Sequence, residues 1–341
     1  MHSLLDIQKR LLPDLLSVMQ KRYYILHYIS IMQPVGRRSL SLSLGLTERV
    51  LRGEVEFLKD QNLLSIATIG MSLTNEGQQL LEKLEGIMRD VTGVNEMEQQ
   101  LQKQLGIKKV VIVTGNSDES PWVKNELGRA TASCMKALLD GENIIAVTGG
   151  STMAAVAEML NPELIEGKKL LFVPARGGIG EDVKNEANTI CANMAENTAS
   201  KHRVLYVPDQ VSKQMYDSFM NEPNIIDVLK LIKAASMVLH GIGDAITMAE
   251  RRKTSIEDIS KLQQLNAVGE AFGYYFNEAG EVVHKVHTVG LQLKDLEHIE
   301  HVLAVAGGAS KAKAIRAYLK KAPQSTILIT DEGAAQRLLQ G

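Results

Sequence analysis

A repeated pattern of short apolar run, glycine-rich turn and helical segment constrains this chain most strongly. After residue 108 the apolar runs end in turns such as Gly149-Gly150 and Gly307-Gly308. Strand, turn and helix in repetition are typical of a parallel sheet covered by helices, so we expect a doubly wound α/β domain. The expected strands are Val110–Thr114, Ile144–Thr148, Leu170–Pro174, Val204–Pro208, Met237–His240, Leu303–Ala306 and Ile327–Thr330, and the expected helices are Trp122–Leu139, Met153–Leu160, Asn185–Ser200 and Ser310–Leu319.

The first part of the chain has a different pattern, with short helical segments and almost no strand signal. A short helix over 38–44, a turn at Gly45 and a longer helix capped by Thr47 form a helix-turn-helix. Leu64–Leu73 alternates around Gly70 as a short hairpin does, which predicts the wing of a winged helix-turn-helix. The predicted core of the two helices is Leu40, Leu44, Leu46, Val50, Leu51, Val55 and Leu58.

The charge of this first part indicates DNA binding. The whole chain has a net charge of −2, yet residues 21–52 contain six basic residues and one acidic residue, a net of +5. Arginine can bind guanine through two hydrogen bonds, and a carboxylate can accept from cytosine. The alternative is a protein-interaction module with a solvated basic face. The predicted DNA-contacting residues are Arg37 and Arg38 toward phosphates, and Thr47, Glu48, Arg49 and Arg52 at the start of the second helix.

The expected domains are residues 1–90, a DNA-binding domain with a linker helix, and residues 91–341, an effector-binding and oligomerisation domain. Between them, Leu80–Leu105 has a near-heptad apolar spacing. This segment either pairs with a second chain or packs on its own domain. Gly86 and Gly93 favour a broken helix over a long coiled coil. Farther on, Gly273–His287 predicts a hairpin with its turn at Glu278–Gly280.

Composition excludes several classes of protein. The two cysteines form no CxxC motif, and no uncharged apolar run approaches the roughly 18 residues of a membrane span, so we expect a soluble cytoplasmic protein. His284/His287 and His298/His301 lack further ligands and predict surface histidines, with neither metal nor cofactor. Cys191 is expected to be a core thiol, and Trp122 is expected at a helix start packed on the sheet.

The glycine-rich turns predict an anion site. Gly149, Gly150, Ser151 and Thr152 follow a strand and open a helix, where backbone N–H groups and hydroxyls can hold a phosphate. No lysine follows at the position that a Walker loop requires. Two other turns carry a fixed cation, Arg176 before Gly177-Gly178 and Lys311 after Gly307-Gly308. Together these turns favour a doubly anionic small molecule, although any one of them alone is typical of tight packing between strand and helix.

Four segments give the chain a family resemblance that extends over essentially its whole length. With the winged helix-turn-helix and the linker helix, the chain resembles the SorC family of sugar-sensing bacterial transcription regulators. The resemblance implies a tetramer-forming repressor of a glycolytic operon that responds to a phosphorylated sugar, fructose 1,6-bisphosphate. It also implies an effector domain similar to sugar-phosphate isomerases and glucosamine-6-phosphate deaminases. The segments are VTGGSTMAAVAEML, LLFVPARGGIGEDVKNEANTICANMA, VLHGIGDA and LAVAGGASKAKAI.

The resemblance assigns roles to individual residues. It implies that the Gly149–Thr152 turn binds one phosphate, that Arg176, Arg251 and Lys311 bind anions, and that Glu270 accepts from sugar hydroxyls. The assignments of Arg251 and Glu270 come from the resemblance alone. LHGIGDAITMAER is similar to a deaminase turn but lacks the His and acidic residues that follow it there. We therefore expect a regulator. The alternatives are an isomerase- or deaminase-like enzyme with an interaction module, and a regulator whose sugar domain serves only for assembly.

Overall fold

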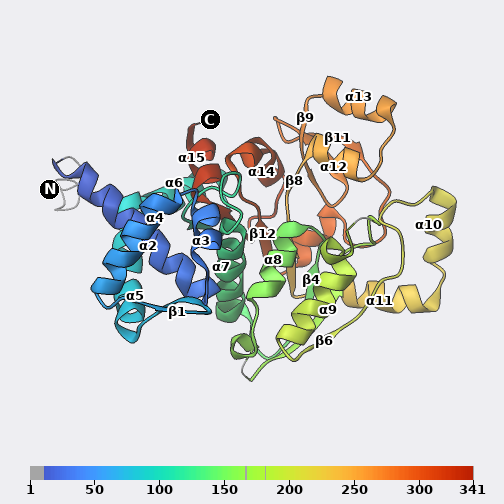
Figure 1. Ribbon diagram of the computed structural model, residues 1–341. Helices are drawn as coiled ribbons and strands as arrows, with labels where there is room; N and C mark the ends of the chain where they lie inside the picture. The colour runs from blue at the N-terminus through green and yellow to red at the C-terminus, as the bar shows by residue number, and fades with distance from the viewer. Residues whose placement is uncertain (1–10, 166, 181, 341) are drawn as a thin grey trace. The chain divides into compact units, whose positions relative to one another are not determined.

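The computed structural model describes residues 11–165, 167–180 and 182–340, and the chain forms two compact units (Figure 1). The first unit takes the chain up to Met97 and also the short segment Glu119–Trp122, and the second unit takes the rest. The expected domain limits at residues 1 and 341 lie outside the described residues. Within the described ranges, no helix combines the length and apolar character needed to cross a membrane.

The first unit contains the helix-turn-helix that the sequence predicts. Gly45 ends the first helix of the motif in the left-handed conformation, with φ 62°. Thr47 caps the second helix, because its hydroxyl accepts from the Val50 amide at 3.3 Å. The helices of this unit are α2 (Pro13–Met32), α3 (Arg37–Leu44), α4 (Glu48–Asp60) and α5 (Asn75–Thr92), and α6 (Val94–Leu105) follows.

The core of the first unit forms around α2, α3 and α4. Ile25, Ile29 and Leu40 are fully buried, and α4 contributes Leu51 and Leu58. The prediction that Val50 belongs to this core is wrong. The Val50 side chain is 43% exposed, because it lies one position outside the helical stripe on which the buried residues of α4 recur.

The predicted wing is a two-stranded antiparallel hairpin of β1 (Leu64–Ala67) and β2 (Gly70–Leu73). Val35 adds a third segment, exchanging two backbone hydrogen bonds with Met71 at 3.0 and 2.8 Å. Gly70 begins β2 rather than lying between the strands. A Cβ at Gly70 would lie 2.9 Å from the Val35 nitrogen, so this position requires glycine.

The predicted break in the linker is confirmed. Gly93, in the left-handed conformation with φ 73°, ends α5, and α6 begins at the next residue. Gly86 stays inside α5. The linker therefore consists of two helices joined at a glycine.

The second unit is built on a parallel sheet in the order β3-β13-β12-β7-β4-β5-β6. Every residue of the central strands β7 and β12 is buried, which requires that both faces of the sheet are covered. The doubly wound fold is thus confirmed, and six of the seven predicted strands are present. The strands are β3 (Lys109–Val113), β4 (Glu142–Val147), β5 (Lys169–Pro174), β6 (Lys201–His202), β7 (Met237–His240), β12 (His301–Val305) and β13 (Thr326–Asp331).

The predicted strand Val204–Pro208 is wrong. The edge strand β6 ends at His202, and farther on Pro208 pairs with Gly178 of the loop after β5 instead of with β5. The Gly178 amide donates to the Val207 carbonyl at 3.0 Å. The segment keeps the strand-like alternation, with Leu205 buried and Tyr206 83% exposed, so its sequence pattern alone does not separate it from a strand.

Helices cover the sheet and position the turns at its carboxyl edge. α7, α8 and α9 lie side by side as one layer (Figure 1) and pack on a core that includes Phe172, Met194 and Leu303. Cys191 is fully buried there, as predicted, and burial raises the pKa of its thiol. The helices are α7 (Val123–Leu138), α8 (Ser151–Met159), α9 (Ala187–Asn197), α10 (Lys213–Phe219), α11 (Pro223–Lys233), α14 (Ala312–Leu319) and α15 (Glu332–Gln340), with 3-10 turns at Pro162–Ile165, Val183–Asn185, Leu293–His298 and Ala309–Lys311.

A second, antiparallel sheet carries Glu270. Its order is β11-β10-β9-β8, and β10 with β11 forms the hairpin predicted over 273–287. Glu270 lies on β9, opposite Tyr275 of β10. The elements of this part are β8 (Gly243–Asp244), α12 (Ala245–Arg251), α13 (Ile256–Gln264), β9 (Ala267–Ala271), β10 (Tyr274–Asn277) and β11 (Val282–Lys285).

Trp122 does not take the predicted place on the sheet. It belongs to the first unit, where its ring lies 6.0 Å from that of Tyr28 and 6.2 Å from that of His27, both on α2. α7 begins only at Val123. Trp122 therefore contributes to the core of the first unit, although Glu98–Asp118 and the chain from Val123 onward belong to the second.

Candidate functional site

A pocket of about 350 Å³ lies in the second unit, where strands of the parallel sheet end. Residues that follow β4, β5, β7 and β12 line it, and β4 and β7 are neighbours at which the strand order reverses. Ligands bind at such a switch point in open α/β sheets. The volume is in the range typical of small-molecule sites.

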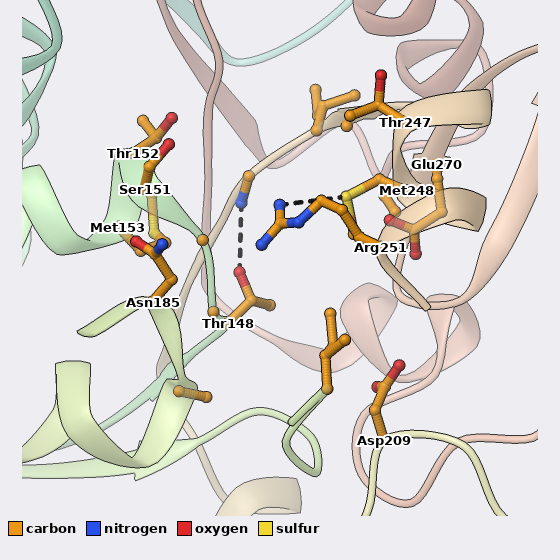
Figure 2. Close-up of a pocket in the computed structure, with 18 of the residues that line it drawn as sticks. Thr148, Ser151, Thr152, Met153, Asn185, Asp209, Thr247, Met248, Arg251 and Glu270 are labelled. Atoms are coloured by element: carbon orange, nitrogen blue, oxygen red, sulfur yellow. Dashed lines mark hydrogen bonds between the residues drawn. The ribbon is translucent and has the colours of Figure 1, made fainter. Parts of the chain in front are cut away.

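One side of the pocket is the N-terminus of α8. The Gly150 amide donates to the Asn185 carbonyl at 2.8 Å. Among the described residues, no acceptor meets the amides of Ser151, Thr152 and Met153, as expected for the first turn of a helix. Three amides and two hydroxyls can therefore bind an anion here. Figure 2 shows Ser151 and Thr152 on one side of the pocket and Arg251 on the other.

Four buried charges form the floor of the pocket, and we call Arg176, Asp209, Arg252 and Glu270 the charge quartet. Arg176 Nε donates to Asp209 at 2.8 Å, and Arg252 Nε donates to the other Asp209 oxygen at 2.9 Å. Both arginines also contact Glu270 Oε1, Arg252 at 2.9 Å and Arg176 at 3.4 Å. The quartet is neutral, and its side chains are at most 8% exposed. Burial opposes the charge on Arg252, but Glu270 and Asp209 raise its pKa, so it stays charged.

Glu270 uses only one of its two oxygens in the described structure. Oε1 accepts from Arg252, from Arg176 and from the Gly273 amide at 2.6 Å. Among the described residues, no hydrogen bond reaches Oε2. The quartet therefore fixes the carboxylate while one oxygen stays available to a ligand.

Two further cations, Arg251 and Lys311, line the pocket outside the quartet. Arg251 Nη1 contacts Met248 Sδ at 3.6 Å, and Figure 2 shows the guanidinium directed into the pocket. Lys311 makes no salt bridge within the described part of the chain. Burial and then the nearby charge of Lys124 lower the pKa of Lys311. An anion beside Lys311 would compensate this charge.

The other carboxylates of the pocket are engaged with backbone amides. Glu186 accepts from Ile179 at 3.1 Å and from Gly180 at 2.8 Å, and Asp244 caps α12 through Thr247 at 2.9 Å. These groups shape the walls. Arg251 and Lys311 are the two cations of the pocket that lie outside the charge quartet.

The turn before Lys311 differs from an open phosphate cradle. Its amides are occupied: Gly308 donates to Asp331 at 2.7 Å, Ala309 to Asn116 at 3.2 Å and Ser310 to Asp118 at 2.8 Å. The Ser310 hydroxyl also donates to Asp118, at 2.9 Å. Side-chain oxygens of Asp331, Asn116 and Asp118 therefore occupy the amides that the sequence suggested for a ligand anion.

The pocket brings together nine of the ten predicted effector residues, and Gly178 lies in a neighbouring cavity with Pro208 and Gln210. Several glycines are required by close packing. A Cβ at Gly149 would lie 2.7 Å from the Asn185 oxygen, and one at Gly177 would lie 2.5 Å from the Pro208 oxygen. The nine are Gly149, Gly150, Ser151, Thr152, Arg176, Gly177, Arg251, Glu270 and Lys311.

The exposed face of the helix-turn-helix carries the predicted DNA contacts in the first unit. Thr47, Glu48, Arg49 and Arg52 are exposed at the start of α4, and Arg37 and Arg38 are exposed at the start of α3. In the described structure, Arg37, Arg38 and Arg49 form no salt bridge. Arg52 pairs with Glu56 at 2.9 Å on the surface. The N-terminal turn of α4 can thus present arginines to a groove.

The basic pair in the middle of α2 has a different role from the arginines of α3 and α4. Lys21 and Arg22 each contact Glu54 at 2.8 Å, and the Arg22 guanidinium lies 3.6 Å from the centre of the Phe57 ring. Burial is the largest single influence and raises the pKa of Glu54, but the combined hydrogen bonds and charges of Lys21 and Arg22 outweigh it, so the pKa is lowered. These contacts join α2 to α4, so two of the six basic residues stabilise the unit.

Sequence reasoning missed several pocket residues. Asp209 and Arg252 complete the quartet, and Asn185 receives the Gly150 amide. Asp209 lies 33 residues from Arg176 and 43 from Arg252, so no local motif connects them. Arg252 adjoins the predicted Arg251, and this pair was the only signal available. Within the described ranges, no group of three His, Cys, Asp or Glu residues is arranged to hold a metal.

Comparisons with known proteins agree with this organisation. Residues 89–340 match a family described as "Putative sugar-binding domain", and residues 18–88 match the "CggR N-terminal DNA binding domain". The chain is 58% identical to the central glycolytic genes regulator of Bacillus subtilis over 340 residues, covering 100% of this chain and 99% of the relative. It is 60% identical to the protein of the same name from Priestia megaterium over 341 residues, with the same coverage.

A crystal structure of a SorC family transcriptional regulator from Enterococcus faecalis is 49% identical to the chain, with a TM-score of 0.68. The match covers 72% of this chain and 99% of the Enterococcus faecalis chain. The chain belongs to the SorC family of sugar-binding transcriptional regulators. It is a DNA-binding regulator and not an enzyme, because its close relatives are regulators and its first part matches a DNA-binding domain.

Proposed function

We propose that the chain is a cytoplasmic repressor of a glycolytic operon, and that fructose 1,6-bisphosphate bound in the pocket modulates its affinity for operator DNA. The observation that carries this proposal is the pocket itself. It combines three open amides at α8 with Arg251 and an unpaired Lys311, among the residues that the structure describes. A molecule with two phosphates can use both groups. The names of the two close relatives support the glycolytic assignment.

Different residues of the pocket bind different groups of the ligand. The Gly149–Thr152 turn binds one phosphate through the amides of Ser151 and Thr152. Arg251 and Lys311 bind the other phosphate. Glu270 Oε2 accepts from a sugar hydroxyl, while Arg176 helps to orient this carboxylate through Oε1.

Residues 1–90 read DNA in this proposal and residues 91–341 bind the effector, with Glu119–Trp122 added to the DNA-reading unit. Arg49 and Arg52 contact base edges in the major groove with Glu48, and Arg37 and Arg38 contact phosphates. The repressor acts as a homo-oligomer, a dimer or tetramer, since dimers of helix-turn-helix proteins bind two half-sites together. Ile87 on α5, which is 47% exposed, is an apolar position available for pairing between subunits.

The effector arm of the proposal is tested by thermal stabilisation. Fructose 1,6-bisphosphate should raise the melting temperature of the full chain more than fructose 6-phosphate or inorganic phosphate, because only the bisphosphate uses both groups of the pocket. Lys311→Met is compared with the surface control Lys230→Met. If no sugar phosphate raises the melting temperature, the effector role is contradicted, and the second unit would serve only for assembly.

The DNA arm is tested by fluorescence anisotropy. Labelled duplexes that tile the region upstream of the chain's own operon are titrated, with a random duplex of equal length as the control. One duplex should bind more tightly than the random one, and fructose 1,6-bisphosphate should change that affinity by about fivefold or more. Equal binding to all duplexes would contradict sequence-specific reading, and an unchanged affinity at saturating bisphosphate would contradict the effector role.

A further inference from the structure

The loop from β3 to α7, residues 114–122, is divided between the two units. Asn116 and Asp118 make their contacts in the second unit, while Glu119–Trp122 belongs to the first. Asp118 in the second unit and Trp122 in the first are therefore separated by only three residues of the chain.

At its first end the loop holds the turn that carries Lys311. Asp118 accepts from the Ser310 amide at 2.8 Å through Oδ2 and from the Ser310 hydroxyl at 2.9 Å through Oδ1. Asn116 accepts from the Ala309 amide at 3.2 Å. Ser310 and Lys311 themselves line the pocket. The Asp118 carboxylate thus occupies donors that open onto the effector site.

The chemistry of this contact is that of a bound anion. The two carboxylate oxygens of Asp118 accept from the amide and the hydroxyl of Ser310. The next residue is Lys311, which forms no salt bridge among the described residues. Asp118 and Asp331 both act electrostatically on Lys311. A ligand phosphate beside Lys311 would compete for the same donors and would be repelled by the Asp118 charge. Binding of that phosphate therefore favours departure of Asp118 from Ser310.

At its other end the loop places Trp122 in the aromatic core of the first unit. The indole is 8% exposed and contacts Tyr28 edge-on at 6.0 Å, with His27 at 6.2 Å and Tyr24 at 6.5 Å. All three partners lie on α2, which packs against α3 of the helix-turn-helix. A shift of Trp122 would therefore alter the support of the DNA-reading helices.

We propose that Asp118 is an internal competitor of the effector phosphate, and that its displacement from Ser310 is transmitted along the loop to Trp122 and α2. The proposal rests on the proposed function of the pocket. Pro121 restricts the backbone of the segment between Asp118 and Trp122. A movement of Asp118 is therefore passed on to Trp122 and is not taken up by backbone rotations between them. Asp118 and Trp122 are positioning residues: neither is needed to bind the sugar or the DNA directly.

Trp122 is the single tryptophan of the chain, so tryptophan fluorescence reports the surroundings of this residue. Titration of the full wild-type chain with fructose 1,6-bisphosphate should change the tryptophan emission with the same midpoint as binding measured by calorimetry. Calorimetric binding without any change in emission would overturn the proposal and leave the proposed function intact. Absence of calorimetric binding would instead refute the proposed function.

Asp118→Asn and Asp118→Ala test the competitor role, with Asp140→Ala as a control at an exposed aspartate outside the pocket. Both Asp118 variants should bind fructose 1,6-bisphosphate more tightly, by about fivefold or more for alanine. Their emission without ligand should shift toward that of the liganded wild type, and their operator affinity should shift in the direction that the effector produces. Affinity and emission equal to those of Asp140→Ala would overturn the proposal.

Trp122→Ala tests the other end, with Trp122→Phe as the conservative variant. The alanine variant should bind the bisphosphate within about twofold of wild type, while its operator affinity no longer responds to the ligand. Phenylalanine should restore the response. A full operator response in Trp122→Ala would overturn transmission through this residue. If Trp122→Ala does not fold, the operator affinity and the emission of the Asp118 variants test the proposed transmission.

Discussion

Arginines serve opposite purposes in the two units of this protein. In the first unit Arg37, Arg38 and Arg49 are exposed and form no salt bridge in the described structure. In the second unit Arg176 and Arg252 have side chains only 8% and 2% exposed, and both are paired with carboxylates. The same residue type is thus solvated in one unit and buried in the other.

This difference indicates that the two units bind anions in different ways. Exposed arginines bind DNA phosphates with release of counterions, and this binding weakens as salt rises. The charges of the buried, paired arginines are already compensated by Asp209 and Glu270, so we assign to the quartet the orientation of Glu270 and the shape of the pocket wall. Binding of the sugar phosphates then falls to the open amides of α8 and to Arg251 and Lys311. The comparison predicts large stability effects in the pocket and large affinity effects on the DNA-reading surface.

Loss of Arg176 should have the largest effect. Arg176→Ala leaves Asp209 and Glu270 buried with one cation fewer and should lower the free energy of unfolding by about 3–5 kcal/mol. Arg203→Ala, at an exposed position, is the matched control and should stay within about 0.5 kcal/mol. Urea denaturation measures both. Equal stability of the two variants would show that the quartet contributes nothing as a buried network.

Lys311→Met should weaken the effector without harming the fold. Loss of one charge-assisted contact should cost about 1.5–3 kcal/mol of binding free energy for fructose 1,6-bisphosphate, measured by calorimetry. The free energy of unfolding should stay equal or rise, because burial already disfavours the Lys311 charge and lowers its pKa. A destabilised variant with unchanged affinity would reverse the roles assigned to Lys311 and Arg176.

The pH dependence of effector binding follows from the same lysine. Because the pKa of Lys311 is lowered in the folded chain, it loses its charge at a lower pH than an ordinary lysine. Affinity for the bisphosphate should therefore fall as pH rises above neutrality, where the ligand phosphates are already dianions. Calorimetry across the alkaline range should show this fall in the wild type and a flatter profile in Lys311→Met. Parallel profiles would exclude Lys311 as the titrating group.

On the DNA-reading surface, Arg52→Ala should cost about 1–3 kcal/mol of operator binding and leave random DNA nearly unaffected. Arg38→Ala should instead weaken both duplexes and reduce the salt slope by about one. Glu56→Ala controls for the surface ion pair of Arg52. Anisotropy titrations at several salt concentrations separate these outcomes. Identical behaviour of the Arg52 and Arg38 variants would remove the distinction between base and phosphate contacts.

The smallest effect is expected at the start of α4. Thr47→Ala removes the hydroxyl that accepts from the Val50 amide and should lower the free energy of unfolding of the chain by about 1 kcal/mol. Thr47→Ser keeps the cap and should restore most of the loss. An unchanged unfolding curve for Thr47→Ala would show that water replaces the cap at this exposed position.

Local signals predicted most of the fold. Gly45, Thr47 and Gly93 end or begin helices where the sequence placed them, because capping and left-handed glycine act within one turn of chain. The parallel strands were visible as apolar runs because both of their faces are buried. The segment Val204–Pro208 has the same composition, but only its pairing partners show that it is not a strand.

The site was predictable only in part. The glycine turns identified the carboxyl edge of the sheet, whereas Asp209 and Arg252 depend on contacts across 33 and 43 residues. The occupation of the Ser310 donors by Asp118 was not predicted either, since it joins positions 192 residues apart. Trp122 was misplaced because its partners lie on α2, in the other unit from its neighbours in sequence.

The central claim, that a sugar bisphosphate in the pocket controls DNA binding, is tested most directly by a closed thermodynamic cycle. Operator affinity is measured with and without saturating fructose 1,6-bisphosphate, and affinity for the bisphosphate is measured with and without operator. Linkage requires that both ratios are equal, and we expect a factor of about 5–150. Ratios equal to one in both directions would contradict the account, because the two ligands would then bind independently.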